Sequence, residues 1–120
     1  MATGRLGTVA GGLNGATMSN PYFVPNGTYS VFNISVTNTT ATAVTVAIAL
    51  STATSSSGIN AGDYIEYGVT IVGKGVFERT GLVAGAGMYV YVGLLSGSST
   101  NNTAGSNVTV NVYGIETSTS

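Results

Sequence analysis

The strongest constraint on the fold is a two-residue alternation of large apolar side chains with small or polar ones. In residues 44–50 every second residue is Val, Ile or Leu, and Thr or Ala stands between them. Successive side chains of a β-strand point to opposite faces of its sheet, so this pattern predicts a strand with one buried face. We find no ten-residue stretch with the period of an amphipathic helix. The sequence therefore predicts an all-β protein.

The same alternation recurs along the chain, with turn-forming residues between the repeats. Strands are expected at 22–24, 32–36, 44–50, 65–71, 76–82, 88–95 and 108–113. This spacing is typical of a sandwich or barrel, and we expect an antiparallel β-sandwich of about seven strands, immunoglobulin-like or jelly-roll-like. The sandwich is expected to span 21–116, after a Gly-rich N-terminal arm at 1–20 and before a polar C-terminal tail at 117–120.

Two hairpins are predicted between neighbouring strands. The polar segment 38–41 is expected to join the second and third strands. Gly73–Lys74 is expected to join the fourth and fifth through a type II′ turn, in which glycine takes the positive φ. That second hairpin makes Glu66 and Arg79 diagonal neighbours, which predicts a surface ion pair. It also places Glu78 among apolar side chains, and a one-residue slip of register would exchange the two faces.

Charged residues are scarce, and this excludes several classes of chemistry. Lys and Arg together number three among the 120 residues, and Asp and Glu together number four. Charged residues are thus 6% of the chain, against about a quarter in an average soluble domain. Histidine and cysteine are absent, so histidine-based nucleophilic catalysis, Cys/His zinc sites and disulfides cannot be built. Three cations and a net charge of -1 also argue against nucleic-acid binding. Hydrophobic residues make up 43% of the chain, which is enough for a folded core.

The few carboxylates and the Gly-rich segments do not form a recognisable site. Asp63 and Glu66 are three residues apart and would lie on opposite faces of one strand, and Asp63 is expected to open that strand after the turn at 60–62. A calcium loop of the usual spacing is missing. The Gly-rich segments 73–75 and 85–87 lack the helix that follows a phosphate loop, so we interpret them as turns. We expect no enzyme activity, catalytic residue, metal or cofactor.

The tyrosines and the small neutral surface residues favour an interaction role. Tyr89 and Tyr91 alternate onto one strand face and could stack on sugars or bases, although such tyrosines more often lie at protein interfaces. Ser, Thr, Ala, Asn and Gly make up much of the remaining surface. Such a face is readily desolvated, so packing against another protein is favoured over catalysis.

The first twenty residues allow two interpretations. They form either a frayed terminus or an arm that becomes ordered on a neighbouring subunit, with Arg5 and Leu6 as its anchors. They lack the apolar run of a secretory signal, and the longest apolar run, at 43–50, is too short for a membrane-spanning helix. We therefore expect synthesis in the cytoplasm and no membrane partner.

Short motifs across most of the chain resemble one family of proteins. They are DYIEY at 63–67, GVFERTG at 75–81 and VYGIE at 112–116, with GRLG at 4–7 and YFVP at 22–25. This pattern resembles small virion structural proteins of tailed bacteriophages, notably phages of cyanobacteria and other aquatic bacteria. The resemblance implies a non-enzymatic particle component, most compatibly a capsid decoration or cement protein on the capsid exterior. It also implies a small homo-oligomer, often a trimer, that binds the major capsid protein after synthesis in the host cytoplasm.

Six residues are the candidates for partner binding: Arg5, Leu6, Glu66, Arg79, Tyr89 and Tyr91. The arginines could each form a charge-assisted bond to a partner carboxylate. Two other functions use the same fold. One is a tail or head-fibre component, and the other is a carbohydrate-binding module, which requires exposed tyrosines on an open sheet face.

Overall fold

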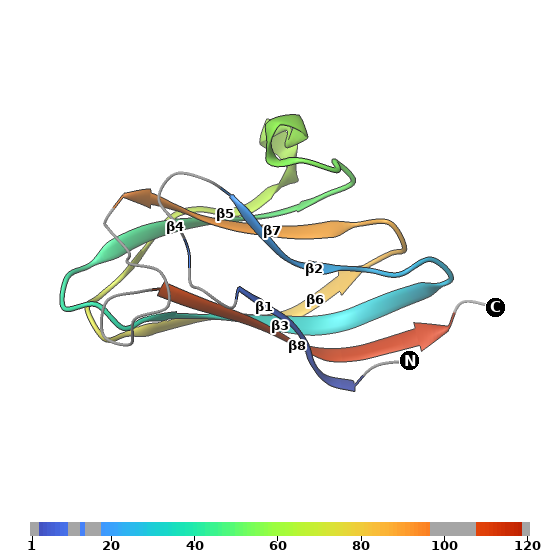
Figure 1. Cartoon of the computed structure of the whole chain (residues 1–120), viewed down its shortest axis with the longest axis horizontal. Coiled ribbons are helices and arrows are strands. Elements are labelled where there is room, and N and C mark those ends of the chain that lie inside the picture. Colours follow the sequence, from blue (N-terminus) through green and yellow to red (C-terminus); the bar gives the residue numbers. More distant parts are fainter. Residues whose placement is uncertain (1–2, 10–12, 14–17, 97–107, 119–120) are drawn as a thin grey trace.

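The computed structural model describes residues 3–9, 13, 18–96 and 108–118 (Figure 1). The elements are β1 (Thr3–Val9), β2 (Ser19–Phe23), β3 (Thr28–Asn38), β4 (Val44–Ser51), the short 3-10 helices η1 (Ser56–Gly58) and η2 (Ala61–Asp63), β5 (Tyr64–Ile71), β6 (Val76–Ala84), β7 (Tyr89–Ser96) and β8 (Val108–Ser118). They form two antiparallel sheets of four strands, in the orders β1-β8-β3-β6 and β2-β7-β4-β5. The all-β prediction is confirmed.

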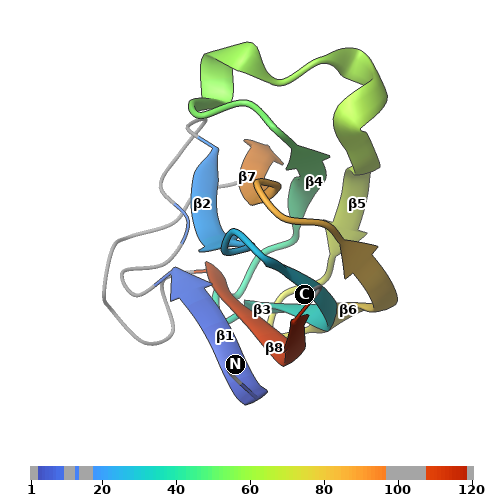
Figure 2. The ribbon, with the colours of Figure 1, turned by 90° about the vertical axis from the view of Figure 1, so that its right-hand side faces the viewer.

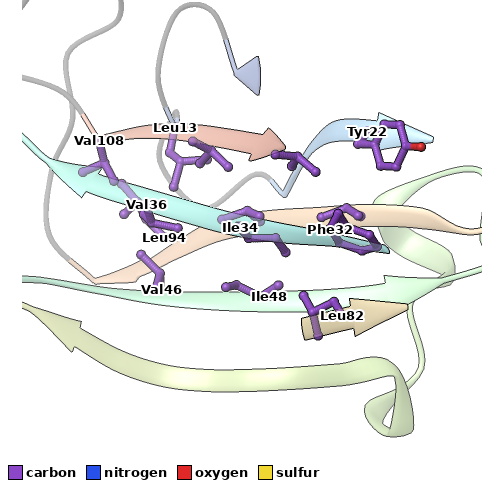
Figure 3. Packing of buried hydrophobic residues seen from close by; sticks show 14 of the residues in the cluster. Leu13, Tyr22, Phe32, Ile34, Val36, Val46, Ile48, Leu82, Leu94 and Val108 are labelled. Atoms are coloured by element: carbon purple, nitrogen blue, oxygen red, sulfur yellow. The ribbon is translucent and has the colours of Figure 1, made fainter. Parts of the chain in front are cut away.

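The core lies between the two sheets, where the large residues of each alternating run meet (Figure 3). The apolar residues predicted to face the core from β3 and β4 are buried, except Leu50, which is partly buried against the core. Strands β7 and β8 contribute alternate residues in the same way. The fully buried large side chains include Phe32, Ile34, Val36, Val44, Val46, Ile48, Val90, Val92, Val108 and Val110. Burial of a side chain of this size stabilises the fold by about 1.5–3 kcal/mol relative to exposure. The two-residue period therefore identifies most of the core, but not in β5, where it groups Tyr67 with Ile65, Val69 and Ile71 although Tyr67 is 67% exposed on the outer side.

The connections between strands differ from the predicted hairpins. Among the eight described strands, β4 and β5 are the only consecutive pair that share a sheet. The segment 38–41 joins β3 to β4 across the sandwich, and the turn at 72–75 joins β5 to β6 across it. Both hairpin predictions are wrong, because alternation shows which face of a strand is buried but not which strand lies beside it. A strand facing the core from either sheet has the same pattern.

The N-terminal residues also differ from the expected arm. Residues Thr3–Val9 form β1, an edge strand that pairs antiparallel with β8. Leu6 and Val9 pack against the core, and Leu13 is buried within it, with its N–H donating to the carbonyl of Val108 at 2.7 Å. Leu6 is half-buried and packs against the protein's own core. The described part of 1–20 belongs to the sandwich, whose strand β8 extends to Ser118.

The two connections at one end of the molecule are hydrogen-bonded to each other. The Asn38 N–H donates to the Gly75 carbonyl at 2.8 Å, and the Lys74 N–H donates to the Thr40 carbonyl at 2.9 Å. Gly75 N–H closes the turn onto the Val72 carbonyl. The turn is therefore placed as predicted, but the positive φ, 61°, belongs to Lys74 in its third position. Type II geometry replaces the predicted type II′, since type II requires the positive φ there.

The Asn38 side chain ties these two connections together from within. It is buried, and its Nδ2 donates to the carbonyls of Thr42, Ile71 and Val72 at 2.8, 3.1 and 3.1 Å. Its Oδ1 accepts from both the N–H and the hydroxyl of Thr40, at 3.0 and 2.6 Å. The amide thus satisfies backbone groups from both connections, which would otherwise lie buried without partners.

A second polar contact links strands of both sheets near the opposite end. The Tyr22 hydroxyl on β2 donates to Oε2 of Glu116 at 2.6 Å and lies 2.5 Å from the Ser30 hydroxyl. Its ring packs edge-on against Phe32, with 5.9 Å between centroids. Burial, followed by the hydrogen bond to Glu116, raises the pKa of Tyr22 to about 12 from 10.0. The neutral phenol is therefore a stabilising part of the folded state.

This raised pKa predicts a loss of stability at high pH. Above pH 10.0 the unfolded tyrosine releases its proton while the folded one keeps it to about 12, so stability falls across that window. Tyr22→Phe should lower the free energy of unfolding at neutral pH by about 1–2 kcal/mol and should flatten this decline. Urea unfolding across the window measures both effects. The exposed Tyr29→Phe is the control, and parallel pH curves for wild type and Tyr22→Phe would contradict the assignment.

Candidate functional site

Aromatic side chains gather on the outer side of the β2-β7-β4-β5 sheet. The sheet places Phe23 beside Tyr89, and Ala49 of β4 between Tyr91 and Tyr64. Cross-strand partners share a face, and Ala47 and Ala49 alternate with the core residues of β4, so these rings project away from the core. Small residues in β4 leave room for the rings on either side. We define the aromatic face as Phe23, Tyr64, Tyr67, Tyr89 and Tyr91.

The rings of the aromatic face contact one another in two groups. Phe23 and Tyr89 have centroids 4.6 Å apart, and Tyr89 and Tyr91 are stacked with centroids 6.0 Å apart. On β5, Tyr64 and Tyr67 meet edge to face at 5.1 Å. These are separations at which aromatic pairs attract one another, so the rings hold one another in place. The face is therefore an organised surface of apolar rings with hydroxyl groups.

The connection between β4 and β5 folds back over the outer side of this sheet (Figure 2). Tyr91 is 2% exposed, and its hydroxyl donates to the Ala53 carbonyl at 2.7 Å. Burial and then the neighbouring Tyr89 raise the pKa of Tyr91. Tyr91 is thus not available to a partner, contrary to its prediction as a binding residue, whereas Tyr89 is half-buried. Alternation assigned the face of Tyr91 correctly but could not show that a loop covers it.

A hollow opens between this covering segment and β5. It has a volume of 350 Å³ and is lined by Ala61, Tyr64 and Tyr67. Tyr67 is 67% exposed at its rim. Next to it, the Asp63 side chain accepts the Asn60 N–H at 2.9 Å and caps η2, as expected for a residue that opens β5. The lining is aromatic and uncharged, which suits a neutral or apolar group rather than an anion.

Sequence reasoning missed Phe23 and Tyr64, and its assignment of Tyr67 to the face of Ile65, Val69 and Ile71 is wrong. Tyr64 and Tyr67 are three residues apart, and strict alternation would put them on opposite faces. Two register shifts between β4 and β5, at Val46/Ala47 and Ile48/Ala49, bring both onto the aromatic face. Gly68 lies at the first of these shifts with a φ of 86°, and an isolated glycine within a strand is a local signal of a bulge. Phe23 could be assigned only once β2 was known to pair with β7.

The predicted ion pair between Glu66 and Arg79 is confirmed, in a different setting. Arg79 Nη1 donates to Glu66 Oε2. The two residues lie on β5 and β6, which are edge strands of opposite sheets, so the pair closes one open side of the sandwich. A partly exposed pair of this kind contributes about 0–1 kcal/mol. The Arg79 guanidinium, predicted to bind a partner carboxylate, therefore has the Glu66 carboxylate of its own chain as a partner.

The outer side of the other sheet holds two of the remaining charged residues. Glu78 is opposite Ser35 of β3 and accepts a hydrogen bond from the Tyr113 hydroxyl, which raises the pKa of Tyr113. The predicted position of Glu78 among apolar side chains is therefore wrong, since β6 belongs to this sheet and turns Glu78 outward. Arg5 on β1 is exposed, and its Nη1 lies 3.5 Å from Oδ1 of Asn111.

Within the described residues there is no group of three or more side chains that could hold a metal ion. The described part of the chain also has no helix long and apolar enough to cross a membrane. Comparison of the chain with protein-family models, curated proteins and solved structures found no match.

Proposed function

We propose that this protein is a non-enzymatic structural component of a tailed-bacteriophage particle, most specifically a capsid decoration protein. In this role it binds the major capsid protein on the capsid exterior after synthesis in the host cytoplasm. The observation that carries the proposal is the aromatic face, an ordered surface without charged side chains that ends in the exposed rings of Phe23 and Tyr67. The resemblance of the short motifs to phage virion proteins supplies the class of partner.

The strand order supports a jelly-roll form of the sandwich. Eight strands in the orders β1-β8-β3-β6 and β2-β7-β4-β5, with nearly every connection crossing between sheets, match the double-sheet arrangement of a jelly roll. Viral capsid domains and lectins share that architecture. The likeness is an analogy at the level of the fold, and a function depends on the residues of a site, here those of the aromatic face.

The aromatic face fits a binding role in which each copy makes a modest contact. Tyrosine and phenylalanine are frequent anchors at interfaces because they bury a large area with few rotatable bonds. The surrounding Ala, Ser and Thr side chains lose little conformational entropy when a partner covers them. Many copies on a regular capsid then add up to a large stabilisation of the particle without a strong single contact.

The proposal predicts binding to expanded capsids that lack this protein, prepared from the phage that encodes it. Wild-type protein should co-sediment with these capsids and raise their melting temperature. Tyr67→Ser should weaken binding at least about tenfold, or about 1.4 kcal/mol, because it removes the most exposed ring of the aromatic face. Val72→Ser is the matched control: Val72 is 66% exposed against 67% for Tyr67, but it lies in the β5–β6 turn.

Two results would refute the capsid role. One is the absence of binding at any protein concentration at which the protein stays folded. The other is a position in purified virions at the tail or at head fibres, in few copies per particle, which would favour the fibre alternative. Equal loss of binding in Tyr67→Ser and Val72→Ser would show that capsid binding does not depend on the aromatic face.

A carbohydrate-binding module remains a second candidate because of the hollow beside Tyr64 and Tyr67. Sugar rings stack on exposed aromatic faces, and an uncharged lining suits a neutral sugar. A glycan array distinguishes the two functions: a signal lost in Tyr67→Ser but kept in Val72→Ser favours sugar binding, and a blank array excludes it.

A further inference from the structure

The outer side of the β1-β8-β3-β6 sheet carries a row of exposed apolar side chains. Val31 of β3 is opposite Val83 of β6 on one side and Ile115 of β8 on the other. Their exposed fractions are 39%, 62% and 48%, and Tyr29, two residues before Val31, is exposed on the same face. We call Val83, Val31 and Ile115 the apolar row. It crosses three neighbouring strands without a charged residue.

Two opposite charges lie on the edge strands of this same sheet. Arg5 on β1 is opposite Tyr113 of β8, and Tyr113 is in turn opposite Asn33 of β3. Asn33 is the next residue of β3 after Val31 that points outward, so Arg5 lies at the level of Asn33. Glu78 on β6 is opposite Ser35, the next outward residue along β3. Arg5 and Glu78 therefore stand at opposite edges of the face and on the same side of the apolar row. One row of the pleat, about 7 Å, separates their levels along the strands.

This arrangement is self-complementary, and we propose that the face binds the same face of a second copy of this chain. The two copies are related by a two-fold axis. This axis lies between the β1-β8-β3-β6 sheet of one copy and the same sheet of the other, and it runs parallel to their strands. Such an axis reverses the strand order, so β1 faces β6 of the second copy and β8 faces its β3. Ile115 and Val31 of each copy then pack against Val31 and Ile115 of the other, and Val83 of each copy lies over Thr3 of the other. Arg5 reaches Glu78 of the second copy at both ends of the interface.

The size of the face fits a stable pair. Strands about 4.8 Å apart that rise about 3.3 Å per residue give four strands of up to eleven residues a face of roughly 19 by 36 Å. That area, roughly 700 Å², is close to the about 800 Å² per partner of a standard interface. The lower layer of Figure 1 shows this sheet with its outer side free of other elements among the described residues. The aromatic face lies on the opposite side of the sandwich and stays accessible in the pair.

The mass of the purified protein in solution tests the pairing. Light scattering or sedimentation velocity over a concentration series should show twice the 12.0 kDa of one chain. Val31→Asp places a charge in the middle of the apolar row and should weaken the pair at least about a hundredfold. Val72→Asp, in the exposed β5–β6 turn, is the matched control and should remain paired. Circular dichroism and thermal unfolding must show that both variants are folded.

A charge exchange tests the registration of the two copies. Arg5→Glu and Glu78→Arg should each weaken the pair about tenfold, because each puts like charges together at both ends of the interface. The double variant, which restores opposite charges, should recover most of the wild-type affinity. Within one chain Glu78 accepts a hydrogen bond from the hydroxyl of Tyr113, which is opposite Arg5. Thermal unfolding of each single variant must therefore match that of wild type before a change in mass is assigned to the pair.

Several outcomes overturn the proposal. A monomer at concentrations up to about 1 mM, where even weak pairs form, excludes the interface. A trimer, as the phage resemblance implies, contradicts the two-fold arrangement, and a pair that survives Val31→Asp uses another surface. None of these results bears on capsid binding, which uses the aromatic face, so failure of this inference and failure of the proposed function are distinguishable.

Discussion

Asn38→Asp is expected to destabilise the protein by about 3–5 kcal/mol at neutral pH, a large part of the stability of a small domain. Asparagine here donates to three backbone carbonyls and accepts from Thr40. An ionised aspartate of the same shape keeps the acceptor but turns the donor into a second negative oxygen that faces the carbonyls. The buried charge and the unpaired carbonyls both oppose folding.

The pH dependence of Asn38→Asp separates this mechanism from a general packing defect. A protonated aspartate can again donate, so the folded variant raises the pKa of this carboxyl, and the deficit relative to wild type should shrink as the pH falls. Urea unfolding at neutral and mildly acidic pH measures it. Asn33→Asp is the matched control, because Oδ1 of the half-buried Asn33 accepts the Gly81 N–H, which a carboxylate also does. Equal destabilisation by both variants would show that the three donated bonds do not matter.

Gly114→Ala is expected to cost about 3 kcal/mol or more, because β8 and β3 approach each other too closely for a side chain there. A Cβ at Gly114 would lie 2.1 Å from the Val31 carbonyl oxygen and 2.6 Å from the Phe32 Cα. Both obstacles are main-chain atoms of β3, so relief requires the two strands to separate and weakens their hydrogen bonds. The strain would spread into the core through Phe32, which is the largest fully buried side chain.

Gly85→Ala is the control for this substitution. A Cβ at Gly85 meets nothing within 4 Å, and the φ of Gly85 is not among the positive ones. Its free energy of unfolding should stay within about 0.5 kcal/mol of wild type. Denaturant unfolding of the two variants, with the slope compared as well as the midpoint, provides the measurement. Wild-type stability in Gly114→Ala would mean that β3 and β8 are further apart than described.

Alternation predicted most strands and their buried residues, because whether a side chain of a strand faces the core or the solvent shows directly in its residue type. The runs around Ile34, Ile48 and Val110 all bury the predicted side chains. Strand pairing is a property of the whole chain, and for that reason both predicted hairpins were wrong. Glu66 and Arg79 were correctly paired although they come from different sheets, since the turn between them brings β5 and β6 close together on either topology.

The candidate site was harder to predict from the sequence than the core was. Tyr91 was assigned to the correct face, but its accessibility depends on a loop whose Ala53 carbonyl accepts the tyrosine hydroxyl. Tyr67 reaches the same face through irregular pairing with β4, for which Gly68 is the signal in the sequence, although a glycine alone does not show how the register shifts. The strand at Thr3–Val9 was missed because an edge strand with few buried residues carries little apolar alternation.

The position of β8 sets the order in which the protein can fold during synthesis. β8 lies between β1 and β3, and it is the strand to which β1 pairs. Until the ribosome has released residues 108–118, β1 has no neighbour in its sheet and β3 has only β6. The first of the described strands thus waits for the last, and until β8 is made the apolar residues that β1 and β3 present to β8 and the core lack part of their packing.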